Sequence, residues 1–226
     1  MRRGLGLAAF VVLVLAVSSW AGARPYSDVE EYRRYVWGDA WPHRATAEVR
    51  DVRFEARYLS PDAVALPALA RGAAEASEVR RQASRATTLH LRIEPVGQSD
   101  DLVFERLRRS GKRAYDAWLN RLLFGMADYV ELDVDGGQPI PLGAYHMERT
   151  FGVGGDPGRS FFLTFPEHAA EALVTGTADL VVREFGLRTG SVRLSFPKAD
   201  ARSLEPSLWD GQTANDPSHP LRSHDR

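Results

Sequence analysis

From residue 47 onward, apolar and polar residues alternate in many short stretches, and a period of two predicts β-strands. The clearest stretch is 47–58, where Val52, Phe54 and Tyr58 alternate with charged residues. The seven predicted strands are centred on residues 52–58, 89–93, 130–134, 142–150, 161–165, 180–182 and 192–196. Asp135-Gly136-Gly137 predicts a tight hairpin between two of them, because glycine adopts the positive φ angles of such turns.

Three other segments have the spacing of helices. Ser27 and Glu30 match a capping box, which predicts a short helix as far as about Trp37. An alanine-rich stretch at 61–85 and an apolar stretch at 102–123 repeat every three or four residues. The predicted interruptions of these helices are at Pro67, Gly72 and Ser110-Gly111.

Alternating strands joined by short turns favour an antiparallel arrangement. We therefore predict a mainly β domain: an antiparallel, immunoglobulin-like β-sandwich that is preceded by a short helix and carries a helical insertion. The alternative is an α+β fold with one antiparallel sheet, because periodicity does not say whether one sheet forms or two.

The N-terminal segment has the three regions of a secretory signal peptide. Arg2 and Arg3 give a positive start, residues 5–17 are apolar, and residues 21–23 offer small side chains for cleavage. We predict a signal peptide at 1–23, and a chain that is exported to the periplasm or the extracellular space. An apolar run this short favours cleavage over a membrane anchor, the alternative in which Trp20 lies at the membrane interface.

The rest of the chain is predicted to be one domain with a polar tail. Its length fits a single hydrophobic core, so we place the β-sandwich domain at 24–197. Apolar residues become sparse after it, and 198–226 is predicted to be disordered.

Composition excludes several function classes. The formal net charge is −1, whereas nucleic-acid binding normally needs a basic surplus. Cysteine is absent, which rules out disulfides, thiolate metal sites and a cysteine nucleophile. A nucleic-acid partner is therefore not expected, nor is a membrane span once the signal is cleaved.

Three stretches resemble a family of uncharacterised exported bacterial domains. They are Phe-Glu-Ala-Arg-Tyr-Leu-Ser-Pro at 54–61, Phe-Phe-Leu-Thr-Phe-Pro at 161–166 and Ser-Val-Arg-Leu-Ser-Phe at 191–196. The similarity spans most of the chain after the signal, with Arg57 where the family usually has threonine. The resemblance implies an exported domain and brings no activity with it.

No catalytic or cofactor motif is complete. The glycine-rich segment 152–160 lacks the lysine and the following helix of a phosphate loop, and Asp133 to Gly137 lacks the later ligands of a calcium loop. His90 and His146 lie in predicted strands, where exposed positions are expected. Three carboxylates, Asp128, Glu131 and Asp133, are the candidates for acid–base chemistry along one strand edge. We predict no cofactor, no metal and no catalytic residue.

The leading hypothesis is a non-enzymatic envelope domain that is structural or binds another protein or another copy of itself. Aromatic residues of the front helix and its flanks form the candidate interaction surface. They are Tyr26, Tyr32, Tyr35, Trp37 and Trp41. The second hypothesis is a carrier of a small apolar ligand or lipid, held among phenylalanines and the helical insertion, although a β-sandwich core needs such aromatics anyway. A hydrolase of unknown class is the third.

Overall fold

The computed structural model describes residues 29–69, 71–97, 102–148 and 157–198, and the side chains of 102–110 are not among them. The helices are α1 (Val29–Trp37), α2 (Pro61–Leu69), α3 (Ala73–Ala83), α4 (Leu102–Phe124), η1 (Met126–Asp128) and α5 (Ala169–Val174). The strands are β1 (Arg44–Val49), β2 (Val52–Leu59), β3 (Ala86–Pro95), β4 (Val130–Val134), β5 (Ile140–Pro141), β6 (Ala144–Met147), β7 (Arg159–Pro166), β8 (Ala178–Val182) and β9 (Val192–Ser195). The predicted signal peptide, Tyr26, most of the glycine-rich segment and the predicted tail from residue 199 lie outside the described residues.

Five strands form one antiparallel sheet in the order β1-β2-β3-β7-β6. The alternation at 47–58 contains two strands rather than the single one predicted. The chain reverses at Arg50 and Asp51, where Arg50 has a φ of 59°, and Val49 then pairs with Val52. The turn contains no glycine, so the alternation of apolar and polar residues gave no sign that one strand ends and another begins there.

Four strands form a second antiparallel sheet in the order β5-β4-β8-β9. The hairpin predicted at Asp135 is confirmed: it joins β4 to β5 and pairs Leu132 with Ile140. Gly136 has a φ of 66°, and the Gly137 N–H donates to the Val134 carbonyl at 3.0 Å.

The two sheets contribute to one apolar core. Phe54, Leu91 and Phe161 from the five-stranded sheet belong to the same buried cluster as Leu180 and Leu194 from the four-stranded sheet. Two antiparallel sheets are thus confirmed, and the alternative with one sheet is wrong. The helices contribute as much of the described chain as the strands do, so the fold is mixed α and β rather than mainly β. An immunoglobulin-like arrangement is not confirmed.

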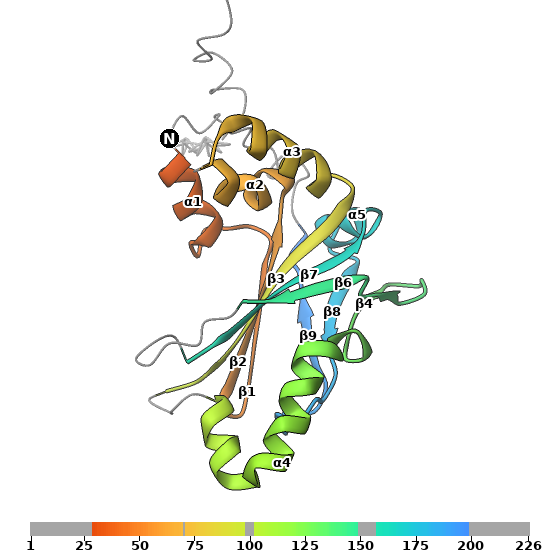
Figure 1. Cartoon of the computed structure of the whole chain (residues 1–226). Helices are drawn as coiled ribbons and strands as arrows, with labels where there is room; N and C mark the ends of the chain where they lie inside the picture. Colours follow the sequence, from red (N-terminus) through yellow and green to blue (C-terminus); the bar gives the residue numbers. More distant parts are fainter. Residues whose placement is uncertain (1–28, 70, 98–101, 149–156, 199–226) are drawn as a thin grey trace, which may run out of the picture.

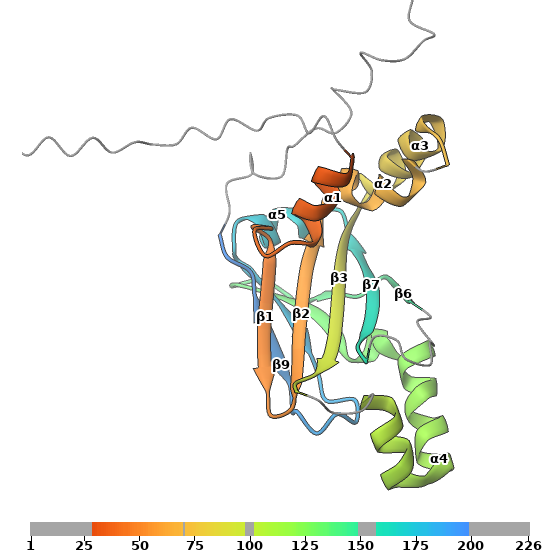
Figure 2. The same ribbon diagram turned by 90° about the vertical axis from the view of Figure 1, so that its left-hand side faces the viewer.

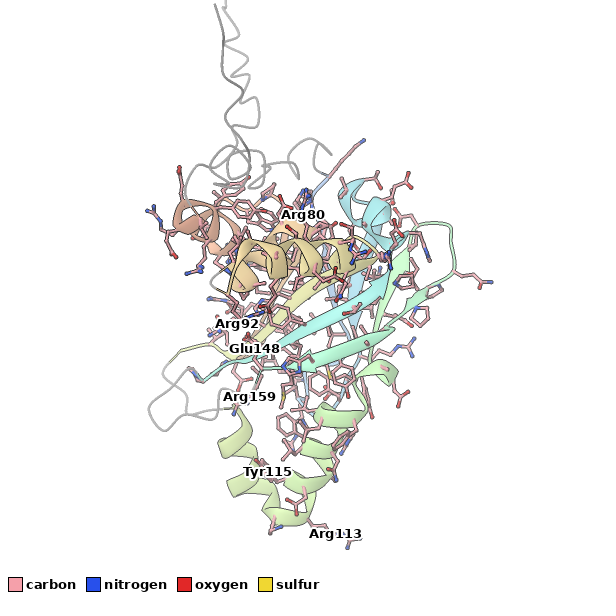
Figure 3. The ribbon with its side chains drawn as sticks, turned by 45° about the horizontal axis from the view of Figure 1, so that its top comes forward. Arg80, Arg92, Arg113, Tyr115, Glu148 and Arg159 are labelled. Atoms are coloured by element: carbon pink, nitrogen blue, oxygen red, sulfur yellow. The ribbon has the colours of Figure 1, made fainter. Side chains whose placement is uncertain are left out.

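The helices lie at two ends of the sheets (Figure 1). At one end α1 and α2 build a second apolar cluster with the end of β2, in which Tyr32, Leu59 and Leu66 are buried. Arg80 of α3, labelled in Figure 3, pairs with Asp62 of α2. At the other end α4 extends along the sheets and turns back on itself (Figures 1 and 2).

The predicted helix interruptions are confirmed only in part. Gly111 breaks α4 with a φ of 77°, and Gly72 separates α2 from α3 with a φ of 136°. Pro67, however, lies inside α2, because the nine-residue helix ends only two residues later. Helix α5 was not predicted, since its six residues are too few to set a helical period.

Within the described ranges, no helix has both the length and the apolar character needed to cross a membrane.

The outer face of the five-stranded sheet as the candidate functional site

The outer face of the five-stranded sheet, which points away from the shared core, carries an unusual set of buried polar side chains. Since successive strand residues point to opposite sides, Phe54 faces the core while Glu55 and Arg57 face outward. Cross-strand pairing then places Arg57 beside His90, and His90 beside Phe162. Figure 2 shows β1, β2, β3 and β7 of this sheet side by side, with α1 at their end.

Arg57 is the best-connected residue of the outer face. Its side chain is only 6% exposed and its Nε donates to the Glu55 carboxylate at 2.6 Å. Its Nη1 donates to the carbonyl oxygens of Val36 and Gly38, both at 2.8 Å. This arginine therefore fixes the C-terminal end of α1 onto the sheet.

Glu55 has a second arginine partner. Arg44 of β1 donates to it at 2.6 Å and also binds Asp39 at 2.5 Å. Burial opposes ionisation of Glu55, but the hydrogen bonds and positive charge of Arg57 and Arg44 outweigh it and lower the pKa of Glu55 below its usual value. The carboxylate is consequently charged at neutral pH.

The charged pairs continue toward the far end of β3. Arg92 donates to Glu94 at 2.8 Å, and Arg53 lies 3.5 Å from the same carboxylate. Ser160 of β7 lies opposite Arg92, and its carbonyl accepts a 2.9 Å hydrogen bond from the Glu148 N–H. Figure 3 labels Arg92 and Glu148 at this part of the sheet. Positive and negative groups thus alternate across the face.

His90 lies in the middle of this face and is 6% exposed. Its ring contacts the edge of Trp37, with centroids 4.8 Å apart, and packs against Phe162 at 5.2 Å. Its Nδ1 atom is buried and has no hydrogen-bond partner in the described part of the structure. Burial, helped by the charge of Arg57, lowers the pKa of His90 to about 4, so the imidazole is neutral at pH 7. The expectation of an exposed strand position is wrong for His90, because Trp37 and Phe162 cover it.

The five aromatic residues predicted as an interaction surface fall into different environments. Tyr32 is fully buried and hydrogen-bonds the Ser60 hydroxyl at 3.0 Å. Trp41 is 2% exposed and donates from Nε1 to the Tyr58 carbonyl at 2.8 Å. Tyr35 is half-buried against Trp41, and Trp37 is 41% exposed. Tyr32 and Trp41 therefore act in the core, while Trp37, with part of Tyr35, is open to solvent.

The residues considered for acid–base or metal chemistry are not brought together. Glu131 and Asp133 form ion pairs with Arg183 and Arg193 at 2.6 Å. His90 and His146 share a row of the sheet, but Phe162 on β7 stands between them. Within the ranges described above, there is no group of three residues suited to hold a metal ion.

A small cavity lies between α4 and the sheets, where the carrier hypothesis placed its ligand. Its walls include Trp118 and Leu122 of the helical insertion and two phenylalanines, Phe161 and Phe185. The volume is about 10 Å³, which is close to the minimum for a single water molecule. In this conformation the site is a packed core with little free space.

Comparisons with known proteins add no activity. No family model matches the chain, and no curated protein matches it. A solved structure of a protein of unknown function from Burkholderia pseudomallei aligns over 81% of this chain and 86% of its own, with 13% identity and a TM-score of 0.32. The lack of a matching family model or curated protein agrees with the resemblance to an uncharacterised family.

Sequence reasoning recognised the outward charges of β2 but not their burial. Arg57, Glu55 and His90 occupy the polar positions of ordinary alternating strands. The available signal was the arginine at position 57, which departs from the usual threonine of the resembling family. That departure alone did not predict that Arg57 contacts the end of α1.

Proposed function

We propose that this chain is an exported, non-enzymatic envelope domain that binds another protein through the outer face, with Trp37 at the centre of the contact. The observation that carries the proposal is the pairing of an exposed tryptophan with a buried, neutral histidine inside a network of arginine–glutamate pairs. Tryptophan and arginine are the residues most enriched among the energetic centres of protein interfaces.

The position of Trp37 supports a role beyond folding. Helix α1 is already held by Tyr32 and Val36, which are buried at 0% and 1% exposure, and by the hydrogen bonds from Arg57. Trp37 is on the last position of the helix and keeps 41% of its surface in water. A partner that covers it gains apolar burial without any change in the fold.

The surrounding side chains support a preorganised surface. Arg44 and Arg57 hold Glu55 from two sides, so these long side chains have lost much of their freedom before any partner binds. Because ordering of flexible side chains costs binding free energy, a fixed face of this kind suits recognition. We also propose that the two sheets pack face to face as in an immunoglobulin-like β-sandwich, because both contribute to one apolar core.

A matched pair of variants tests the proposal. A tagged full chain with Trp37→Ala should lose at least about tenfold of the co-purified partner, as expected for an interface centre. Phe124→Ala is the control, because Phe124 is the other large exposed apolar residue of the described part, at 80% exposure. Equal recovery of every bound protein by Trp37→Ala and wild type would contradict the proposal.

Export is tested separately. The N-terminal sequence of the protein recovered outside the cytoplasm should begin at Arg24 if the predicted cleavage takes place. If the partner is a second copy of the chain, the sedimentation coefficient of the wild type should rise with protein concentration. The sedimentation coefficient of Trp37→Ala should not.

A further inference from the structure

Helix α4 concentrates positive charge at one end of the molecule. The segment Leu102–Phe124 has a formal charge of +4, whereas the whole chain has −1, so the rest of the chain carries −5. The basic residues of the segment are Arg106, Arg108, Arg109, Lys112, Arg113 and Arg121, and the acidic ones are Glu105 and Asp116. The charge of this protein is therefore strongly uneven, although its sum is close to zero.

The second half of α4 has one side that packs and another that faces water. Trp118 and Leu122 are buried in the shared core, and their spacing of four residues places them on the same side of the helix. On another side, positions that follow one another by three or four residues are all exposed. They are Arg113, Ala117, Arg121 and Phe124, and we call them the α4 stripe.

The positive charge of the α4 stripe is not neutralised within the helix. Asp116 is the one acidic residue in the second half of α4, and it pairs with Lys112 at 2.7 Å. Arg113 and Arg121 form no ion pair with the residues that the structure describes, and Arg121 donates to the Ala117 carbonyl at 3.4 Å. Figure 3 shows Arg113 at the outer end of α4, where it points away from the sheets. Both arginines can therefore meet an anionic partner.

Phe124 gives the α4 stripe an apolar end. Its exposed fraction is 80%, compared with 41% for Trp37, the other large apolar residue that is exposed in the described part. An aromatic ring in water gains free energy when an apolar medium covers it. Basic residues and an exposed aromatic ring on one helix face are typical of helices that lie on an anionic membrane surface.

We propose that α4 docks the protein onto an anionic phospholipid surface. Arg113 and Arg121 bind the lipid phosphates, and the Phe124 ring enters the boundary between the head groups and the acyl chains. A lipid surface is favoured over a nucleic acid because it presents a negative layer directly above an apolar one. Helix α1, which carries Trp37, lies at the opposite end of the sheets (Figures 1 and 2). Docking through α4 therefore keeps Trp37 away from the membrane.

Co-sedimentation with vesicles tests the charge requirement. The chain from Arg24 onward, the predicted mature protein, is used so that the apolar run at 5–17 cannot itself bind lipid. It should bind vesicles of phosphatidylcholine and phosphatidylglycerol in equal parts, and should not bind vesicles of phosphatidylcholine alone. Raising the salt from about 0.1 M to about 1 M should release it, because the screening length falls from about 10 Å to about 3 Å.

Three results of this experiment would overturn the proposal. They are equal binding to both kinds of vesicle, no binding to either kind, and binding to a single-stranded RNA oligonucleotide without binding to anionic vesicles.

Two double variants locate the binding surface. Arg113→Gln with Arg121→Gln should weaken binding to the anionic vesicles by at least about tenfold, since each cation near such a surface contributes about fivefold. Arg183→Gln with Arg193→Gln is the control with the same change of charge, because both arginines are more than half exposed beside the four-stranded sheet. Equal losses in the two double variants would show general charge attraction and reject α4 as the docking element.

The apolar contact is tested at Phe124 alone. Phe124→Ala should weaken vesicle binding by about fivefold, because no ring enters the apolar layer, whereas Phe124→Trp should retain it, because tryptophan favours the membrane interface. Thermal denaturation checks that both variants are folded. Vesicle binding by Phe124→Ala as tight as that of the wild type would contradict the proposal. A loss of vesicle binding without loss of the protein partner would separate this docking from the contact at Trp37.

Discussion

The two faces of the five-stranded sheet are built from the same strands but are stabilised in different ways. On the inner face Phe54, Leu91 and Phe161 are fully buried and gain their stability from apolar packing. On the outer face Arg57 and His90 are buried almost as deeply, although both are polar. Burial of polar groups is costly unless they are paired. Arg57 meets this cost with hydrogen bonds to Glu55, Val36 and Gly38, whereas His90 is neutral and leaves its Nδ1 unpaired.

The exposed pairs of the four-stranded sheet sharpen the contrast. Arg193 binds Asp133 and Asp179 at 2.6 and 2.7 Å, yet its side chain is 55% exposed. Arg57 makes similar contacts at 6% exposure. The buried ion pair of Arg57 and the exposed ion pairs of Arg193 should therefore contribute differently to the free energy of unfolding.

The largest predicted effect compares two adjacent phenylalanines. Phe161→Ala removes a fully buried inner-face ring and should lower the free energy of unfolding by about 3–5 kcal/mol. Phe162→Ala on the outer face, where the ring is half-buried, should lower it by about 1–2 kcal/mol. Urea denaturation measures both values, and equal losses would show that the two faces are packed alike.

The next effect depends on pH. The folded chain holds the pKa of His90 at about 4, while the unfolded value is 6.5. The unfolded chain therefore binds a proton that the folded chain does not, and stability falls as the pH drops from about 6.5 to 4, by up to about 3 kcal/mol.

The variant His90→Phe should remove that part of the pH dependence when urea denaturation is measured at pH 7 and at pH 4.5. His146→Phe is the matched control, since His146 is on the same row but exposed. Identical pH slopes for His90→Phe and wild type would show that His90 is accessible to protons in the folded state.

A smaller loss is predicted for the charged network. Arg57→Met leaves Glu55 with one arginine and removes the hydrogen bonds to the carbonyls of Val36 in α1 and of Gly38 just after it, which should cost about 2 kcal/mol. Arg193→Met should leave the free energy of unfolding close to the wild-type value, because its partners stay solvated. If both variants lose the same stability, burial does not strengthen the outer network.

The smallest effects concern the exposed aromatics. Trp37→Ala should lower the free energy of unfolding by about 1 kcal/mol, because it uncovers His90, and Phe124→Ala should change it by less than about 0.5 kcal/mol. Thermal denaturation of the two purified variants measures this difference. A loss of several kcal/mol for Trp37→Ala would make Trp37 a core residue and weaken its role in binding.

The sequence predicted the inner face better than the outer one. Alternation located Phe54, Leu91 and Phe161 because apolar residues at a period of two need only a core to bury them. It could not locate the contact of Trp37 with His90, since the register between strands and the position of α1 come from tertiary packing. The turn at Arg50 was missed because neither of its residues is a glycine or proline.

Site-directed photo-crosslinking in the native host tests the central claim most directly. A photoreactive phenylalanine analogue replaces Trp37 in one sample and Phe124 in another, and covalent products are compared after illumination of intact cells. The account predicts a discrete protein adduct from position 37 that is absent from position 124. No adduct at position 37, or the same adducts at both positions, would contradict the assignment of the outer face as the binding surface.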